Sequence, residues 1–294
     1  MGSVRSADGV EIAFGRLDAA ERSSRPRTRL LFAHATGFCS TVFRPMAAAL
    51  SDTYECWALD FRAHGHSGRP QPGGLRWESI ASDVAAVTDA VDEDEGIAPW
   101  AGVGHSMGGA ALILAQTAGT TPRFDRLWVY EPVVFPPAVV DAAPDPGEML
   151  ALGALRRRSR FEDREEARRN YSAKPPMSAF HRASVDGYLE RGLRDLPDGT
   201  VELSCRPADE AETYRMGGRH HAWDSLPSLS IPVTVVTGDT SRPGPGMFAE
   251  RIAGRITLGT VEVHPELGHF GPMEDPESMA RSVRMSNGSS PLPR

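Results

Sequence analysis

The sequence has little cysteine, almost no lysine and no long uncharged apolar run. Its three cysteines, Cys39, Cys56 and Cys205, are odd in number and far apart, which excludes a disulfide framework and a zinc-binding spacing. No stretch of about 18 apolar residues exists to span a bilayer. The first residues also lack the basic and apolar pattern of a secretory signal. We therefore expect a cytoplasmic protein with no membrane association.

Charge and length narrow the class of protein further. Among 294 residues, 32 are Lys or Arg and 39 are Asp or Glu, giving a net charge of −7 that does not suit a nucleic-acid partner. Lys174 is the only lysine, and we infer no partner from this bias. With 40% hydrophobic and 24% charged residues, the composition is that of an ordinary globular protein. A chain of this length can bury about 75% of its unfolded surface, in one large domain or two small ones.

Short β-prone runs alternate with longer stretches of helical periodicity. The expected strands are 11–17, 30–33, 55–59, 100–103, 127–130, 232–237 and 260–263. The expected helices are 41–50, 77–91, 107–118, 246–252 and 276–285. This alternation predicts an α/β fold with a mostly parallel sheet.

The alternation stops between residues 132 and 229, where proline-rich turns, a charged segment and another helical stretch replace it. We interpret residues 132–229 as an inserted helical cap, or lid. The core then consists of residues 1–131 and 230–286, and residues 287–294 form a disordered tail.

Residues 104–108 read Gly-His-Ser-Met-Gly, which matches the G-x-S-x-G pattern of a nucleophile elbow. A predicted strand precedes this pattern and a predicted helix follows it. Ser106 would therefore sit on a strained turn with its hydroxyl above the sheet, and the glycines would leave room for the tight crossing. We interpret Ser106 as a candidate nucleophile.

A serine hydroxyl needs a base to take its proton and a carboxylate to orient that base. His269 is the candidate base, because it follows the last predicted strand in a loop that can reach the elbow. Such a base contributes about 100- to 10,000-fold in rate.

Four segments together resemble the α/β-hydrolase superfamily. They are GHSMG at 104–108, HATGF at 34–38, DFRAHGHS at 60–67 and LGHF at 267–270. The resemblance extends from about residue 11 to residue 285. It implies an eight-stranded, mostly parallel sheet with helices on both faces and a helical cap inserted after the sixth strand.

The resemblance also implies an oxyanion hole made of two backbone N–H groups. One donor would be the amide of Met107, which follows the nucleophile at a helix N-terminus. The loop at 34–38 would supply the other, from Thr36 or alternatively from Phe38. Asp60, Arg62, His64 and His66 are interpreted as residues that shape the neighbouring loop.

Two carboxylates compete for the role of the orienting acid. In most of the superfamily the acid follows the seventh strand in a Gly-x-x-Asp turn, but here Gly238-Asp239-Thr240-Ser241 places a serine at that position. Asp239 comes two residues earlier. Glu131 directly follows the strand at 127–130, which is similar to haloalkane dehalogenases and zearalenone lactonases, whose acid follows the sixth strand. We favour Glu131 and keep Asp239 as the alternative.

Apolar side chains near the expected site are candidates for the wall of a substrate pocket. His220 and His221, where the cap returns to the core, are further candidates. The pocket residues that we predict are Phe38, Cys39, Phe135, Met177, Phe180, His220, His221, Met247 and Phe270.

These features favour a serine hydrolase that cleaves an ester or lactone of a small to medium, largely apolar molecule through an acyl-enzyme. A serine nucleophile disfavours dehalogenation and epoxide opening, which need a carboxylate there. Cleavage of a C–C bond, thioester hydrolysis and perhydrolysis would use the same residues, and a ligand-binding receptor of the same fold is the non-enzymatic alternative. We expect no cofactor and no metal site, and the only expected partner is the small-molecule substrate.

Overall fold

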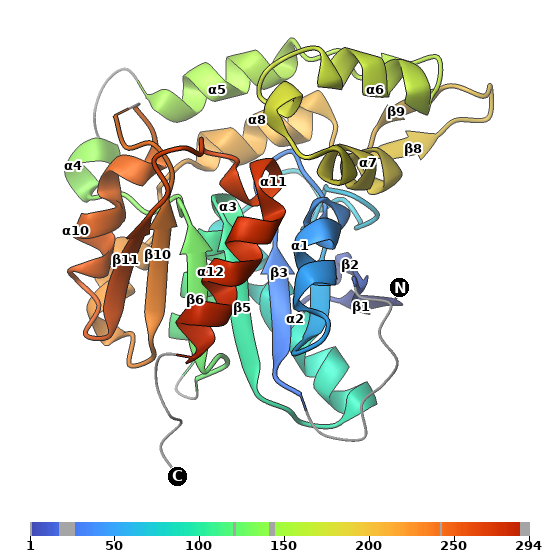
Figure 1. The fold of residues 1–294 in the computed structure, drawn as a ribbon. Helices are drawn as coiled ribbons and strands as arrows, with labels where there is room; N and C mark the ends of the chain where they lie inside the picture. The colour runs from blue at the N-terminus through green and yellow to red at the C-terminus, as the bar shows by residue number, and fades with distance from the viewer. Residues whose placement is uncertain (1, 18–26, 120–121, 141–144, 242, 289–294) are drawn as a thin grey trace.

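A computed structural model describes residues 2–17, 27–119, 122–140, 145–241 and 243–288. Eight strands form one sheet in the order β1-β2-β4-β3-β5-β6-β10-β11 (Figure 1). Their bounds are β1 Gly2–Arg5, β2 Glu11–Arg16, β3 Arg29–Ala33, β4 Glu55–Leu59, β5 Trp100–His105, β6 Arg126–Tyr130, β10 Val233–Thr237 and β11 Gly259–Val263. The β1–β2 and β2–β4 pairs are antiparallel and the others are parallel. The predicted eight-stranded, mostly parallel sheet is confirmed.

Helices cover both faces of this sheet (Figure 1). One face packs on α2 (Trp77–Glu95), α3 (Met107–Thr117) and α10 (Ala249–Ala253), and the other on α1 (Arg44–Leu50) and α12 (Pro276–Gly288). The core also contains three short helices, which are η1 (Ser40–Phe43), η4 (Pro245–Phe248) and α11 (Gly271–Glu274). Helix α12 ends at Gly288, so residues 287 and 288 of the predicted tail are helical. The rest of that tail lies outside the described residues.

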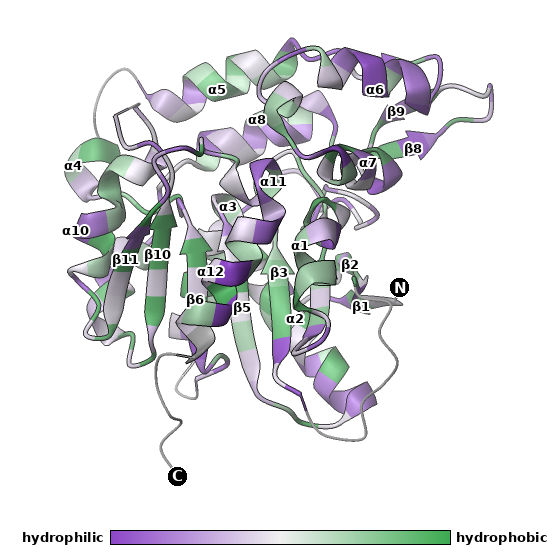
Figure 2. Ribbon diagram, in the orientation of Figure 1, coloured by the Kyte–Doolittle hydropathy of each residue, from purple (hydrophilic) through white to green (hydrophobic). Residues whose placement is uncertain are grey.

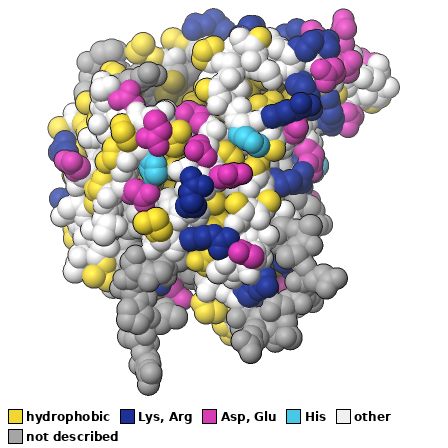
Figure 3. Space-filling view, viewed as in Figure 1, with side chains coloured by type: hydrophobic (Ala, Val, Ile, Leu, Met, Phe, Trp, Pro, Cys, Tyr) yellow, Lys and Arg dark blue, Asp and Glu magenta, His cyan; other side chains and the backbone are white. Residues whose placement is uncertain are grey.

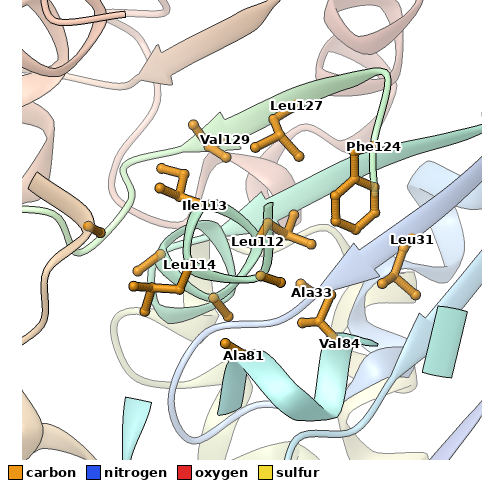
Figure 4. Close-up of a cluster of buried hydrophobic side chains, with 14 of the residues drawn as sticks. Leu31, Ala33, Ala81, Val84, Leu112, Ile113, Leu114, Phe124, Leu127 and Val129 are labelled. Atoms are coloured by element: carbon orange, nitrogen blue, oxygen red, sulfur yellow. The ribbon is translucent and has the colours of Figure 1, made fainter. Parts of the chain in front are cut away.

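Strand alternation explains why the sheet has two hydrophobic faces. Leu31 and Ala33 of β3 face α2 and α3, whereas Leu30 and Phe32 belong to the cluster on the opposite face. Figure 4 shows Leu31 and Ala33 packed with side chains of α2, α3 and β6. In Figure 2 the central strands β3, β6 and β10 are mainly hydrophobic, and hydrophilic residues gather on α6 and α12. The core is therefore a layered α/β core on both sides of one sheet.

The segment at 132–229, which we call the cap, lies across the carboxyl ends of the parallel strands (Figure 1). Its helices are α4 Pro137–Val140, α5 Pro146–Leu155, α6 Arg164–Ser172, η2 Met177–Ala179, α7 Arg182–Arg191, α8 Pro207–Met216, α9 Ala222–Ser225 and η3 Leu226–Ser228. It also contains a small antiparallel sheet of β7 Arg160–Phe161, β9 Val201–Leu203 and β8 Leu193–Asp195, which the sequence pattern did not predict. Basic and acidic side chains intermingle over this part of the surface (Figure 3).

A buried ion-pair network holds the loop after β4 and joins it to the cap. Asp60, fully buried, accepts from the amides of Ser40 and His66 and from Arg191 of α7, at 2.7 to 2.9 Å. Arg62, also fully buried, bonds to Asp83 of α2 and to Asp8. These contacts agree with the loop-shaping role expected of the 60–67 segment.

Candidate active site

Ser106 lies between the end of β5 and the start of α3, with φ of 54°. A positive φ at a residue other than glycine is strained, and such strain concentrates at functional sites. The chain can make this turn only with small neighbours. A Cβ at Gly108 would lie 2.0 Å from the carbonyl oxygen of Ala33, and one at Gly104 would lie 2.7 Å from Gly109 Cα. The predicted strand–turn–helix elbow is therefore present.

Glu131 follows β6 and also has a positive φ, 42°. Its Oε2 accepts a hydrogen bond from Nδ1 of His269 at 2.6 Å. Its Oε1 accepts from the amide of Gly238 at 3.0 Å and from Oγ1 of Thr237 at 3.1 Å. Burial raises the pKa of Glu131, but the hydrogen bonds from His269, Gly238 and Thr237 outweigh burial and hold this pKa below its ordinary value. The carboxylate is thus fixed in its ionised form beside His269.

The carboxylate of Asp239 is oriented differently. Its Oδ1 accepts from the amide of Ser241 at 2.9 Å and from Oγ of the same serine at 2.6 Å. This is an Asx turn, in which an aspartate stabilises its own loop. Of the two acids that the sequence left open, the one that the structure brings to His269 is Glu131.

His269 uses Nδ1 for Glu131, which leaves Nε2 as the nitrogen available to a substrate or to a serine proton. Its side chain is 31% exposed, whereas Glu131 is 4% exposed. Ser106 is 7% exposed. The arrangement can therefore support proton transfer from a serine hydroxyl to a histidine that a buried carboxylate orients.

The loop at 34–38 lies against the N-terminus of α3, where Oγ1 of Thr36 is 3.5 Å from Sδ of Met107. The amide of Gly37 donates to Nε2 of His64 at 3.0 Å, and the amide of Phe38 donates to the carbonyl of Ala35 at 3.2 Å. Within the described ranges, neither the amide of Thr36 nor the amide of Met107 donates a hydrogen bond to a protein group. These two amides are therefore available to bind an anion.

Two neutral histidines hold this loop in place. His34 Nε2 accepts from the amide of Phe61 at 3.0 Å, and its Nδ1 donates to the carbonyl of Ala35 at 2.8 Å. Burial and the neighbouring His64 lower the pKa of His34 to about 3, and burial lowers the pKa of His64. Because the ring of each stays neutral, each can accept one backbone bond and donate another.

Comparison with known proteins identifies the family. The chain matches the model of the alpha/beta hydrolase family over residues 30–282. The chain belongs to this family. It is 28% identical over 243 residues to 2-(acetamidomethylene)succinate hydrolase of Mesorhizobium japonicum, a match that covers 79% of this chain and 77% of that protein.

Solved structures of other proteins share the fold of this chain. The crystal structure of E-2-(acetamidomethylene)succinate hydrolase superposes with a TM-score of 0.73 at 21% identity, covering 98% of this chain and 99% of that one. An esterase from Rhodococcus sp. ECU1013 gives a TM-score of 0.71 at 23% identity, covering 98% of each chain. At such identities the likeness is one of fold.

Three predicted wall residues of this alpha/beta hydrolase form an aromatic cluster beside His269. The ring centroids of Phe38, Phe180 and Phe270 lie 5.4 to 5.9 Å apart. The ring of Phe270 is also 4.9 Å from that of His269. Core and cap thus contribute to one apolar surface next to the candidate base.

The other predicted pocket residues differ in their surroundings. Cys39 is fully buried, and its thiol contacts Thr41 and backbone carbonyls of α7, so it packs in the interface between core and cap instead of lining a cleft. His221 is exposed, Met247 is 54% exposed, and Met177 is 5% exposed. Phe135 packs on Phe248 with centroids 5.4 Å apart.

His220 joins the cap to the core of this hydrolase. Its Nε2 donates to the carbonyl of Val133 at 2.7 Å, its Nδ1 accepts from the amide of Ala222 at 3.2 Å, and its ring packs edge-on against Trp77. Burial lowers its pKa to about 4. Both ring nitrogens are occupied by backbone groups, which corrects the expectation that His220 contacts substrate.

Sequence reasoning did not single out His105 and Tyr130, which directly precede Ser106 and Glu131. Nε2 of His105 lies 2.8 Å from the carbonyl of His269, and the hydroxyl of Tyr130 donates to the carbonyl of Gly268 at 2.7 Å. The available signal was their position at the ends of adjacent strands, one residue before each functional candidate.

The described residues contain no helix that is both long and apolar enough to cross a bilayer.

Proposed function

We propose that this protein is a serine hydrolase that cleaves an ester or lactone of a small to medium, largely apolar molecule. The observation that carries the proposal is the 2.6 Å hydrogen bond between His269 and Glu131, on a sheet edge that also presents Ser106 on a strained elbow. Hydrolase and esterase relatives of the same fold support it.

In the proposed reaction, Oγ of Ser106 attacks the substrate carbonyl while Nε2 of His269 takes the hydroxyl proton. Glu131 stabilises the imidazolium that forms. The imidazolium then gives its proton to the departing alkoxide, leaving an acyl-enzyme and an alcohol. Water then attacks the acyl group and gives a proton to His269. His269 passes this proton to Oγ of Ser106 as the acid leaves, which restores the enzyme.

The amides of Thr36 and Met107 are the proposed oxyanion donors. Both are available, whereas the amide of Phe38, the alternative donor, is bonded to the carbonyl of Ala35. The Met107 amide also lies at the N-terminus of α3, where the helix dipole favours negative charge. Loss of one such donor costs about 100- to 1,000-fold in other enzymes.

The apolar substrate class is supported by the aromatic cluster of Phe38, Phe180 and Phe270 beside His269. Apolar rings provide contact area for an acyl chain or ring but no partner for charge. Cleavage of a C–C bond and thioester hydrolysis use the same groups on a different substrate, and perhydrolysis replaces the attacking water with hydrogen peroxide. A receptor of this fold would have no need for the hydrogen bond between Glu131 and His269.

A second candidate substrate class comes from the relative in Mesorhizobium japonicum, whose name specifies a succinate derivative. Arg157 is a cation near the loop at 34–38, where a Cβ on Gly37 would lie 3.3 Å from its Nη1. However, Arg157 already pairs with Glu210 and donates to the hydroxyl of Tyr188 at 3.1 Å. A neutral, apolar substrate is therefore favoured over a dicarboxylate.

We further propose that the enzyme works in the cytoplasm. Cys39, Cys56 and Cys205 are all buried, and none of the three forms a disulfide in the described structure, which suits a reducing compartment.

The test is covalent labelling with a fluorophosphonate probe, followed by a panel of neutral and carboxylated esters and lactones. We expect labelling of the wild-type protein and of the exposed control Ser228→Ala, and none of Ser106→Ala. Equal labelling of Ser106→Ala, or none of the wild type, contradicts a serine hydrolase. Higher kcat/KM for carboxylated than for neutral esters contradicts the apolar substrate class.

A further inference from the structure

Strands β5 and β6 end side by side at the site, and their last residues, His105 and Tyr130, are paired in the sheet register. Their rings lie 5.9 Å apart. The next residue on each strand belongs to the proposed chemistry, Ser106 after His105 and Glu131 after Tyr130. The pair therefore directly precedes the proposed nucleophile and the proposed acid on two neighbouring strands.

Each of these two side chains bonds to the turn that carries the base. Nε2 of His105 lies 2.8 Å from the carbonyl oxygen of His269, so this nitrogen carries the proton and donates it. The hydroxyl of Tyr130 donates to the carbonyl of Gly268 at 2.7 Å. Two consecutive carbonyls are thus held by two neighbouring strands.

Two further bonds complete the connection, one between the two strand ends and one between the end of β6 and the turn. The amide of Ser106 donates to the carbonyl of Tyr130 at 2.9 Å, and the carboxylate of Glu131 accepts from the ring of His269. The strand ends and the turn therefore form a closed ring of hydrogen bonds. Within it the nucleophile, the acid and the base are each connected to His105 or Tyr130 directly or through the adjacent residue.

His105 is fully buried, and within the described residues its Nδ1 has no hydrogen-bond partner. Burial, reinforced by the nearby His269, holds its pKa well below the ordinary value, so the ring stays neutral. An unpartnered buried nitrogen is costly for a fold. The bond to the carbonyl of His269 is the one polar contact of this ring in the described structure, and it ends at the base.

Close packing prevents the turn from shifting. A Cβ on Gly271 would lie 2.3 Å from the hydroxyl oxygen of Tyr130, and one on Gly238 would lie 2.4 Å from the carbonyl of Leu267. On its far side the amide of Gly268 donates to Glu274 at 2.8 Å. The two bonds from the strands therefore act on a turn with little room to adapt.

We propose that His105 and Tyr130 are positioning residues that place the imidazole of His269 between Ser106 and Glu131. This inference rests on the proposed serine hydrolase function. Neither side chain transfers a proton in the reaction. Each fixes the backbone of the base, because a misplacement of about 1 Å can cost about 100-fold in rate.

The test compares His105→Leu, which removes the donor, with His105→Gln, whose amide nitrogen can reach the same carbonyl. Tyr130→Phe removes the other donor and retains the ring. Ser282→Ala is the control, since it removes a buried hydrogen bond from Trp128 of β6 and one to Glu262, neither of which involves the turn of His269. Readouts are kcat and KM on an activated ester, the rate of fluorophosphonate labelling, and the downfield NMR proton of His269 Nδ1.

We expect His105→Leu to lower kcat and the labelling rate about 10- to 100-fold with little change in KM, and to shift or broaden the His269 proton. His105→Gln restores most of the rate, Tyr130→Phe loses about tenfold, and Ser282→Ala matches the wild type. Wild-type rates in both His105→Leu and Tyr130→Phe overturn the inference. A His105→Gln variant that is folded but as slow as His105→Leu also overturns it.

Failure of the proposed function has a different outcome. It leaves the wild-type protein unlabelled or makes labelling independent of Ser106, whereas failure of the positioning role leaves Ser106-dependent labelling at the same rate in every variant. If His105→Leu does not fold, Tyr130→Phe and His105→Gln decide the question alone.

Discussion

The imidazole of His269 donates to the carboxylate of Glu131, whereas the carboxylate of Asp239 turns toward Ser241 in its own loop. Glu131 reaches the histidine from the end of β6, the strand next to the one that carries Ser106. This relationship assigns the acid's position to the sixth strand and makes Glu131 the proposed orienting acid.

Substitution of the two acids separates their roles. We expect Glu131→Gln to lower kcat on an activated ester by about 1,000- to 10,000-fold, because the amide cannot stabilise the imidazolium and favours the wrong tautomer. Asp239→Asn should stay within about twofold of the wild type. Circular dichroism confirms that both variants are folded. Collapse of turnover in Asp239→Asn alone would show that Asp239 is the acid.

Glycine at position 108 should be essential to the elbow. Gly108→Ala places a methyl group 2.0 Å from the carbonyl oxygen of Ala33, and we expect it to destabilise the fold by about 3 kcal/mol or more. The matched control is Gly153→Ala in helix α5, where no described atom lies within 4 Å of the new methyl group. That change should stabilise by about 0.4 to 1 kcal/mol. Urea unfolding measures both, and similar values for the two variants would contradict the close approach.

Acid should destabilise the protein because its buried histidines remain neutral. The pKa of His34 is about 3 and that of His220 about 4 in the folded protein, against about 6.5 when unfolded. Below pH 6.5 these two histidines bind protons in the unfolded chain but stay unprotonated in the folded protein. Stability is therefore complete above pH 6.5 and falls by about 1.4 kcal/mol per pH unit for each such histidine, down to its folded-state pKa.

The pH dependence is checked by measuring the free energy of unfolding between pH 7 and pH 5. His220→Gln should reduce the slope by the contribution of one histidine. The exposed control Ser228→Ala removes no titratable group and should leave the slope unchanged. Equal slopes for the wild type and His220→Gln would be inconsistent with a His220 that stays neutral in the folded protein.

Removal of the buried Arg62 side chain should strongly lower the free energy of unfolding. It is fully buried and bonds to Asp83, which is also fully buried, so Arg62→Met leaves an unpaired carboxylate inside the protein. We expect a loss of about 3 to 5 kcal/mol in urea unfolding. Arg160→Met removes an exposed pair with Asp198 and should cost about 1 kcal/mol or less. Comparable losses would show that the buried network contributes little.

Local patterns were sufficient to predict most of the core. The strand at 55–59 coincides with β4, and the elbow and its helix lie where the glycines and apolar periodicity indicated. Strand β1 was missed, because Gly2–Arg5 is an exposed edge strand with no apolar alternation. The cap sheet was missed because its strands are only two or three residues long and pair across the cap.

The sequence by itself determined the fold class and the elbow at Ser106 and made His269 the candidate base, because each depends on residue types within a few positions of one another. Only the tertiary structure showed that Glu131, and not Asp239, is bonded to His269, and that the amide of Phe38 is bonded within its own loop. It also showed that the side chains of His105 and Tyr130 bond to the turn that carries His269, and that Cys39 is buried against α7. These outcomes depend on distances between residues that lie far apart in the chain, which are set by strand order and packing.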